Sequence, residues 1–224
     1  MFQKLKLAIK LFPFSCEYKK NLVVVLIMTA VGVLIEVVSH GMNFLGGYFF
    51  LISAMFPVQF IFGLGHSNLV GTSTYKKQLQ TSIPVIVNFI MSIIIFTILF
   101  LIKLLEIHFF PASQNGILSG FLMLGFFEIM LCIYDAFVYK YYWVSILMFA
   151  VVFVWVYNCM GNQDTYILGI QQLVSSVSPV VMLLLVYLSV FFGVVLQYVL
   201  SLLLYKKPLS KRSQGANIRR QLSA

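Results

Sequence analysis

The sequence predicts an all-α membrane protein with six transmembrane helices in a single domain over residues 1–224. Hydrophobic residues make up 61% of the chain and charged residues 9%, whereas roughly a quarter of a water-soluble domain is charged. The mean hydropathy is +1.00. A span needs about 20 apolar residues, because a rise of about 1.5 Å per residue must cover roughly 30 Å of hydrocarbon. Runs of this length cover residues 22–39, 44–64, 83–105, 117–138, 141–159 and 177–204.

The segments outside these runs carry their own predictions. Residues 2–14 are expected to form an amphipathic helix in the membrane interface, because apolar and basic residues fall on separate faces of a helical wheel. The alternative is an irregular charged start. Residues 160–176 form either a short helix that dips back into the membrane or a surface loop. The run 177–204 is longer than an upright span needs, so we expect it to tilt or to extend beyond the bilayer.

The basic residues predict the orientation. With six spans, all 15 lysines and arginines except Lys103 lie on the side that holds both termini. Because basic residues are enriched in cytoplasmic segments, both termini are expected in the cytoplasm. The basic tail, residues 205–224, is expected to contact anionic lipid headgroups or to be solvated. This distribution argues against nucleic acid as a partner.

Two carboxylates inside the predicted spans are candidates for a translocation path. Glu128 lies near the middle of the fourth span, where an ionised carboxylate costs several kcal/mol unless it is paired or hydrated. Glu36 lies in the first span, closer to the outer interface. The alternative for each is a protonated residue that hydrogen-bonds between helices. Asp135, near the end of the fourth span, is expected to pair with Lys140.

The sequence contains no motif for a metal site, a disulfide or a catalytic site. The three histidines have no metal-binding spacing, and the three cysteines form no CxxC motif, so we expect no metal site and no disulfide. The chain has neither a G-x-S-x-G nucleophile elbow nor a GxxxxGK[ST] phosphate-binding loop. We therefore expect the chain not to be an enzyme, and any ATP hydrolysis to occur in another subunit.

The most informative segment is the polar island NLVGTSTYKKQLQTS, residues 68–82, between the second and third runs. Ser73 or Thr74 could cap a short helix through Lys76. On that helix Tyr75 and Leu79 are four residues apart and share a face, so together they could fit a pocket on a partner. The alternative is a solvated connector whose lysines only follow the orientation rule.

Residues 72–84, TSTYKKQLQTSIP, resemble the corresponding segment of small ABC-2 type permease subunits from exporters of Gram-positive bacteria. The shared features are the serine, the basic pair and the LQTSIP run. Relatives often have proline where this chain has Thr74. At the level of layout the resemblance covers nearly the whole chain, because that family has an interfacial elbow helix, six spans, a docking segment between spans two and three, and re-entrant helices before the last span.

The resemblance implies a function and its partners. The chain would be the permease of an ATP-binding-cassette exporter in the bacterial plasma membrane, paired with an identical or related permease and with two cytoplasmic ATPases. ATP and Mg²⁺ would bind to the ATPases, and this chain would hold no cofactor. The cargo would be an amphipathic peptide, antibiotic or lipid, moved by alternating access. The ATPase-coupling residues would be Ser73, Thr74, Tyr75, Lys76, Lys77 and Leu79.

Two other classes remain open from the sequence. One is the six-span substrate-binding component of an energy-coupling-factor vitamin importer. That class needs small residues on the first span to dock a membrane scaffold, and Thr29, Ala30 and Gly32 supply only a poor version. The other is a membrane immunity or scaffold protein without transport activity.

Overall fold

The computed structural model describes five continuous stretches, residues 18–39, 45–65, 74–111, 114–138 and 178–206, and shorter pieces at 6, 9–10, 140–141 and within 144–154. Within these stretches the backbone is helical apart from short turns, and it contains no strand. The helices of the continuous stretches are α2 (Tyr18–Ser39), α3 (Leu45–Gly65), α5 (Lys76–Gln80), α6 (Ser82–Phe109), α7 (Gln114–Val138) and α10 (Pro179–Tyr205).

The described helices have the length and composition of a multi-pass membrane protein. Four segments are long and apolar enough to cross a membrane, namely Leu22–Ser39, Lys76–Phe109, Gln114–Val138 and Val180–Tyr205. A shorter apolar helix covers Leu45–Gln59. These helices coincide with the predicted runs other than 141–159, which lies largely outside the described residues. The predicted all-α membrane fold is thus confirmed at this level.

Other predicted segments fall mainly outside the described part of the chain. In the interfacial helix at 2–14, only Lys6, Ile9 and Lys10 are described, and all three are helical and exposed. Residues 160–176, Ser73, and the tail beyond Lys206 lie outside the description.

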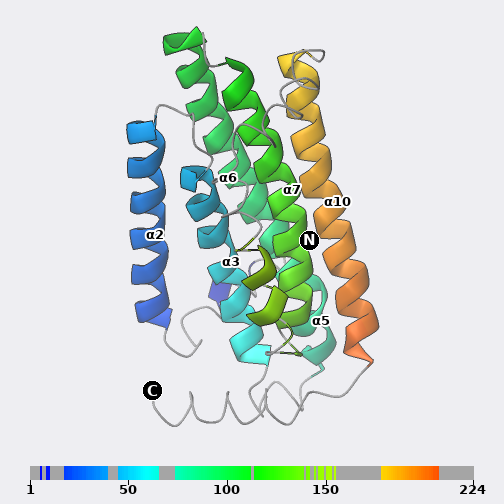
Figure 1. The fold of residues 1–224 in the computed structure, drawn as a ribbon. Coiled ribbons are helices and arrows are strands. Elements are labelled where there is room, and N and C mark those ends of the chain that lie inside the picture. Colours follow the sequence, from blue (N-terminus) through cyan, green and yellow to red (C-terminus); the bar gives the residue numbers. More distant parts are fainter. Residues whose placement is uncertain are drawn as a thin grey trace.

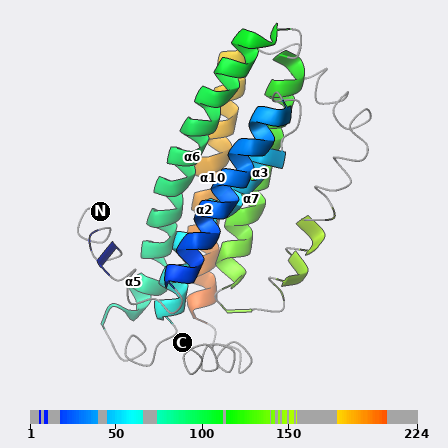
Figure 2. The ribbon, with the colours of Figure 1, turned by 90° about the vertical axis from the view of Figure 1, so that its left-hand side faces the viewer.

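The long helices stand side by side in a bundle with α5 at one end (Figure 1). We call this the α5 end, and we call the opposite end, where α6 finishes, the Phe109 end. Helices α2 and α6 run from the α5 end to the Phe109 end, and α3 runs back (Figure 1). Helices α7 and α10 both run toward the α5 end. Figure 2 shows α5 at the foot of α6 and α2 on the outside of the bundle.

The core lies between α3, α6, α7 and α10. Helix α10 packs most extensively on α7, while α2 packs mainly on α3. Aromatic rings fill the half of the core nearer the Phe109 end, where Phe96 of α6 meets Phe121 of α7 edge to face with 5.9 Å between ring centroids. On the outside, α2 and α10 expose many large apolar side chains, such as Val38 and Leu188. A face of this kind suits contact with lipid.

Small residues allow two close helix crossings. At the α2–α3 crossing, a Cβ on Gly46 would lie 2.8 Å from the carbonyl oxygen of Gly32. At the α7–α10 crossing, a Cβ on Gly125 would lie 2.7 Å from Ser189 Oγ, and one on Gly193 would lie 3.1 Å from Cys132 Sγ. Glycine at such positions lets helix backbones approach closely, which favours helix association in a membrane.

Candidate functional site

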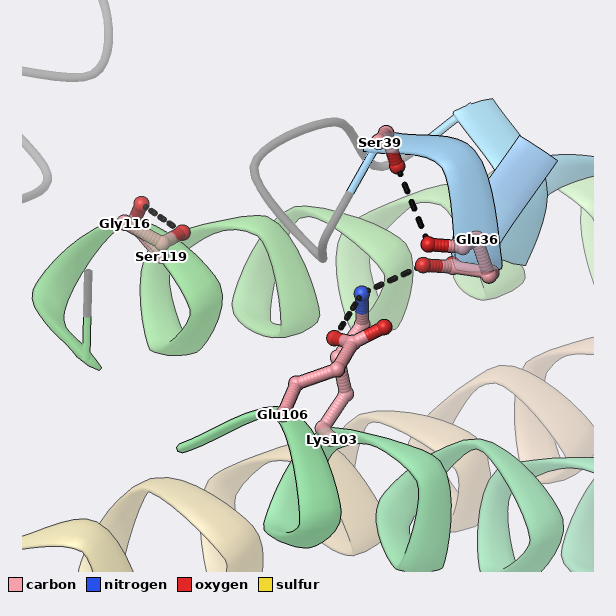
Figure 3. Close-up of polar contacts among 6 residues, drawn as sticks. All are labelled: Glu36, Ser39, Lys103, Glu106, Gly116 and Ser119. Carbon is pink, nitrogen blue, oxygen red and sulfur yellow. Dashed lines mark hydrogen bonds and ion pairs between the residues drawn. The ribbon is translucent and has the colours of Figure 1, made fainter. Parts of the chain in front are cut away.

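A buried ion-pair cluster joins α2 to α6 near the Phe109 end (Figure 3). The Lys103 ammonium donates to Glu36 Oε2 at 2.6 Å and to Glu106 Oε2 at 3.0 Å. Glu36 is 1% exposed and Lys103 is 3% exposed. We call these three residues the Lys103 cluster. It holds one positive and two negative side chains at a depth where an unpaired charge would be costly.

The Glu36 carboxylate fits between α2 and α3 because α3 begins with two glycines. A Cβ on Gly46 would overlap Glu36 Cγ and lie 2.9 Å from Glu36 Cδ. A Cβ on Gly47 would lie 3.3 Å from Glu36 Oε1 and would overlap Leu124 of α7. Glu36 Oε1 itself has no hydrogen-bond partner among the described residues. The glycines therefore create the space that the carboxylate occupies.

A second buried polar cluster joins α6, α7 and α10 deeper in the bundle. Ser92 Oγ donates a short hydrogen bond to Glu128 Oε1, and Cys132 Sγ lies 3.6 Å from the same oxygen. Asn88 Nδ2 donates to Gln197 Oε1 at 2.8 Å and lies 3.5 Å from Cys132 Sγ. All of these side chains are buried. We call them the Glu128 cluster: Asn88, Ser92, Glu128, Cys132 and Gln197.

Asp135 and Lys140 do not form the ion pair that their proximity in the sequence predicts. Both side chains are buried. The Lys140 ammonium donates to the carbonyl oxygen of Leu204 in the last turn of α10, where the carbonyls form the negative end of the helix dipole. Neither carboxyl oxygen of Asp135 has a hydrogen-bond partner in the described part of the chain. The prediction of an Asp135–Lys140 pair is wrong because the helix end binds the lysine.

Helix α5 is packed against the end of the bundle, in contact with α3, α6 and α10. Tyr75 occupies its N-cap position and is 52% exposed, and Lys77 is also exposed. Leu79 is only 3% exposed. The Leu79 amide donates to the Tyr75 carbonyl at 2.9 Å, and Thr81 Oγ1 donates to the Lys77 carbonyl at 2.7 Å.

Two expectations for this segment need correction. Tyr75 and Leu79 do not form a common exposed face, because a short helix lying on the bundle must bury its one large aliphatic side chain. Thr74 does not cap the helix either: it is exposed in the preceding turn, and no side-chain hydrogen bond caps α5. Lys76 is half-buried. Among the described residues of the segment, 74–82, the exposed ones are therefore Thr74, Tyr75 and Lys77.

The two predicted path residues lie in different clusters. Glu36 forms an ion pair with Lys103 of α6, whereas Glu128 accepts a hydrogen bond from Ser92 of α6. Ser92 precedes Lys103 on α6 and therefore lies closer to the α5 end. Sequence reasoning missed the partners of both. The sequence did point to Lys103 as a possible ion-pair partner, because it is the exception to the predicted charge asymmetry and Glu106 follows three residues later. The sequence pointed less clearly to Asn88 and Ser92, which are polar residues four apart on one face of a helix inside an apolar run.

The described residues contain no group of three or more histidine, cysteine, aspartate or glutamate side chains that could hold a metal ion. The arrangement instead offers an ion-pair link between helices, a hydrogen-bonded polar cluster inside the bundle and an exposed aromatic at its end. No protein-family model, curated protein or solved structure matches this chain.

Proposed function

We propose that this chain is the membrane-spanning subunit of an ATP-driven exporter, with α5 as the docking point for a cytoplasmic ATPase. The observation that carries the proposal is the placement of α5. It is fixed to α3, α6 and α10 through buried residues, while Tyr75 and Lys77 face outward. Tyrosine is one of the residue types enriched in protein-binding hot spots. The resemblance of residues 72–84 to the docking segment of ABC-2 permeases supports the same role.

Helix α5 is well suited to transmit a movement. It is separated from α6 by Thr81 alone, and α6 has 28 residues. At about 1.5 Å per residue, α6 spans roughly 42 Å. A push on Tyr75 would therefore reach α6 directly and α3 and α10 through packing. In the proposed mechanism this movement drives alternating access.

The helix directions support the six-span topology that this function needs. Helix α7 ends at the α5 end, and α10 begins at the Phe109 end (Figure 1). The chain between Val138 and Pro179 must therefore return across the bundle, which agrees with a span at 141–159. Lys76, Lys77 and Lys140 lie at the α5 end, so the orientation rule assigns this end to the cytoplasm in the proposal.

The remaining parts of the proposal follow the family resemblance. The chain would work with a second permease, identical or related, and with two ATPases that bind ATP and Mg²⁺. It would catalyse no reaction itself and would sit in a bacterial plasma membrane. Glu36 and Glu128 remain the proposed path residues. The few fixed charges of the bundle favour an amphipathic cargo such as a peptide, an antibiotic or a lipid.

Purification from the native membrane in mild detergent tests this function. We expect the chain to co-elute with an ATPase in a two-to-two ratio, and Tyr75→Ala to reduce both co-elution and ATPase stimulation. The matched control is Phe109→Ala, since Phe109 is an aromatic at the opposite end and is 70% exposed, compared with 52% for Tyr75. Unchanged co-elution in Tyr75→Ala would refute docking through α5.

The same purification separates the alternatives. A vitamin-loaded monomer would support the importer component, and an isolated chain would support the immunity or scaffold protein. Either result would contradict the exporter proposal.

A further inference from the structure

Buried polar side chains form a column from the middle of α7 to the α5 end. Glu128, Cys132 and Asp135 are spaced by four and three residues, so they share one face of α7. Asn88 and Ser92 of α6 and Gln197 of α10 bond to this face or to each other. The α10 residue one turn beyond Gln197 is Ser201, which is also buried.

Several atoms of this column lack the partners that buried polar atoms need. Both carboxyl oxygens of Asp135 and Nε2 of Gln197 are buried without a hydrogen-bond partner among the residues that the structure describes. The other end of the Gln197 amide bonds to Asn88, so the free Nε2 belongs to the cluster. An unsatisfied buried polar group costs about 1–3 kcal/mol, and more if charged. Bound water with two to four polar partners is the usual solution.

The column differs in polarity between its two ends. On α6 and α7, the buried residues within two turns of Ser92 and Glu128 toward the Phe109 end are apolar, including Ile95, Phe96, Leu99, Phe121 and Leu124. Phe96 and Phe121 pack edge to face there, and the nearby buried hydroxyl of Tyr48 has no hydrogen-bond partner among the described residues. Toward the α5 end, the column continues through Asp135 to Lys140. Polar access to Glu128 is therefore expected from the α5 end.

We propose that water enters this column from the α5 end and that Glu128 is a proton-binding site reached through Asp135. A hydronium ion at the α5 end donates a proton to the Asp135 carboxylate and leaves as water. The proton then passes through intervening water to the Glu128 carboxylate, which leaves Asp135 ionised and ready to accept the next proton. Among the described residues, the column holds amides, hydroxyls and carboxyls, and no group of three or more histidine, cysteine, aspartate or glutamate side chains that could hold a metal ion.

Besides the two carboxyls, the described titratable groups around the column are Tyr48, Cys132 and Lys140. The facing residues of α6 (Asn88, Ser92) and of α10 (Gln197, Ser201) do not titrate. On α3, Tyr48 packs on Phe127 with 4.4 Å between ring centroids. Cys132 lies between the two carboxyls on α7, and the Lys140 ammonium is bound to Leu204.

Labelling of Cys132 tests the entry of water. In the protein used for labelling, Cys16 and Cys159 are replaced by serine, so that Cys132 is the one cysteine left. The full chain is reconstituted alone in vesicles of known orientation. A small hydrophilic methanethiosulfonate reagent should label Cys132 when it is added on the α5 side. It should not label Cys132 when it is added on the other side. The matched control adds Cys132→Ala and Leu188→Cys. Leu188 faces outward on α10, so it should not be labelled from either side.

Infrared difference spectroscopy tests the proton site by a separate readout. A protonated carboxyl band should respond to pH on the α5 side, shift in D₂O and disappear in Glu128→Gln. In Asp135→Asn the D₂O exchange of this band should slow. Both results should be the same with sodium or choline as the only salt cation.

The outcomes distinguish this inference from a structural hydrogen-bond cluster. Labelling from neither side together with a pH-insensitive Glu128 would overturn the proposal. Labelling from the Phe109 side alone would overturn the direction of access. Because these vesicles contain no ATPase, neither result depends on docking at Tyr75.

Discussion

Lys103 of α6 and Glu36 of α2 form an ion pair with 2.6 Å between Nζ and Oε2, and both side chains are almost fully buried. The two residues are far apart in the sequence. Helix α2 makes its main contacts with α3, so this pair is a direct side-chain link from α2 to α6. It also explains the single lysine that departs from the charge asymmetry, because Glu36 and Glu106 neutralise it.

Removing the lysine should destabilise the bundle more than removing the whole pair. Lys103→Met leaves the buried Glu36 carboxylate without its ion-pair partner, and loss of one partner of a buried ion pair costs about 3–5 kcal/mol. The double variant Lys103→Met with Glu36→Gln should recover much of this loss. Unfolding free energies in mixed detergent micelles measure the effect. A double variant as unstable as the single one would show that the pair is not coupled.

A methyl group at Gly46 should also disturb the Lys103 cluster. In Gly46→Ala the new Cβ overlaps Glu36 and approaches the Gly32 carbonyl, and overpacking of this kind costs about 1–3 kcal/mol. Gly193→Ala is the control, because its Cβ would meet the Cys132 sulfur at 3.1 Å. We expect a smaller loss of thermal stability there. An equal loss at both sites would count against a special role for Gly46.

Substitutions of Leu79 and Tyr75 should distinguish the residue that anchors α5 to the bundle from the residue that docks the partner. Leu79→Ala removes a buried side chain that fixes α5 and should cost about 2–5 kcal/mol of stability. Tyr75→Ala removes an exposed side chain and should leave the stability of the isolated subunit nearly unchanged. Thermal unfolding of the two purified variants gives the comparison. A large loss in Tyr75→Ala would mean that the tyrosine supports the fold instead of a partner.

Ser92 should matter more than a serine that bonds only within its own helix turn. Ser92→Ala leaves Glu128 Oε1 with only the weak thiol donor of Cys132, and loss of a hydrogen bond to a buried acceptor costs up to about 1–3 kcal/mol. Ser53→Ala is the matched control, since Ser53 is buried but donates to the Phe50 carbonyl of α3. Unfolding in detergent should rank Ser92→Ala as the less stable variant. The reverse order would argue against a strong Ser92–Glu128 bond.

Helix positions were predictable from the sequence because a span needs only an apolar run of sufficient length. Helix α6 illustrates the limits, since it ends at Phe109 and not at 105. The apolar residues Ile107 and Phe109 continue the helix past the predicted boundary.

The partners inside the bundle were harder to predict. Glu36 and Glu128 could be singled out as buried carboxylates, but their partners depend on how each helix is rotated and packed. The four-residue spacing of Tyr75 and Leu79 predicted that they share a helix face. It could not predict that the bundle would cover Leu79 and leave Tyr75 exposed. Asp135 and Lys140 are close in sequence, yet the end of α10 competes for the lysine.

The Lys103 cluster sets an order for the biogenesis of the protein. A lysine at the centre of a helix entering the bilayer costs about 3 kcal/mol, and Lys103, six residues from the end of α6, costs less but still gains from a partner. Helix α2 is synthesised before α6, so the Glu36 carboxylate is already in place when Lys103 leaves the ribosome. We therefore expect the insertion of α6 to be favoured by α2, which is made earlier and supplies the carboxylate that pairs with Lys103.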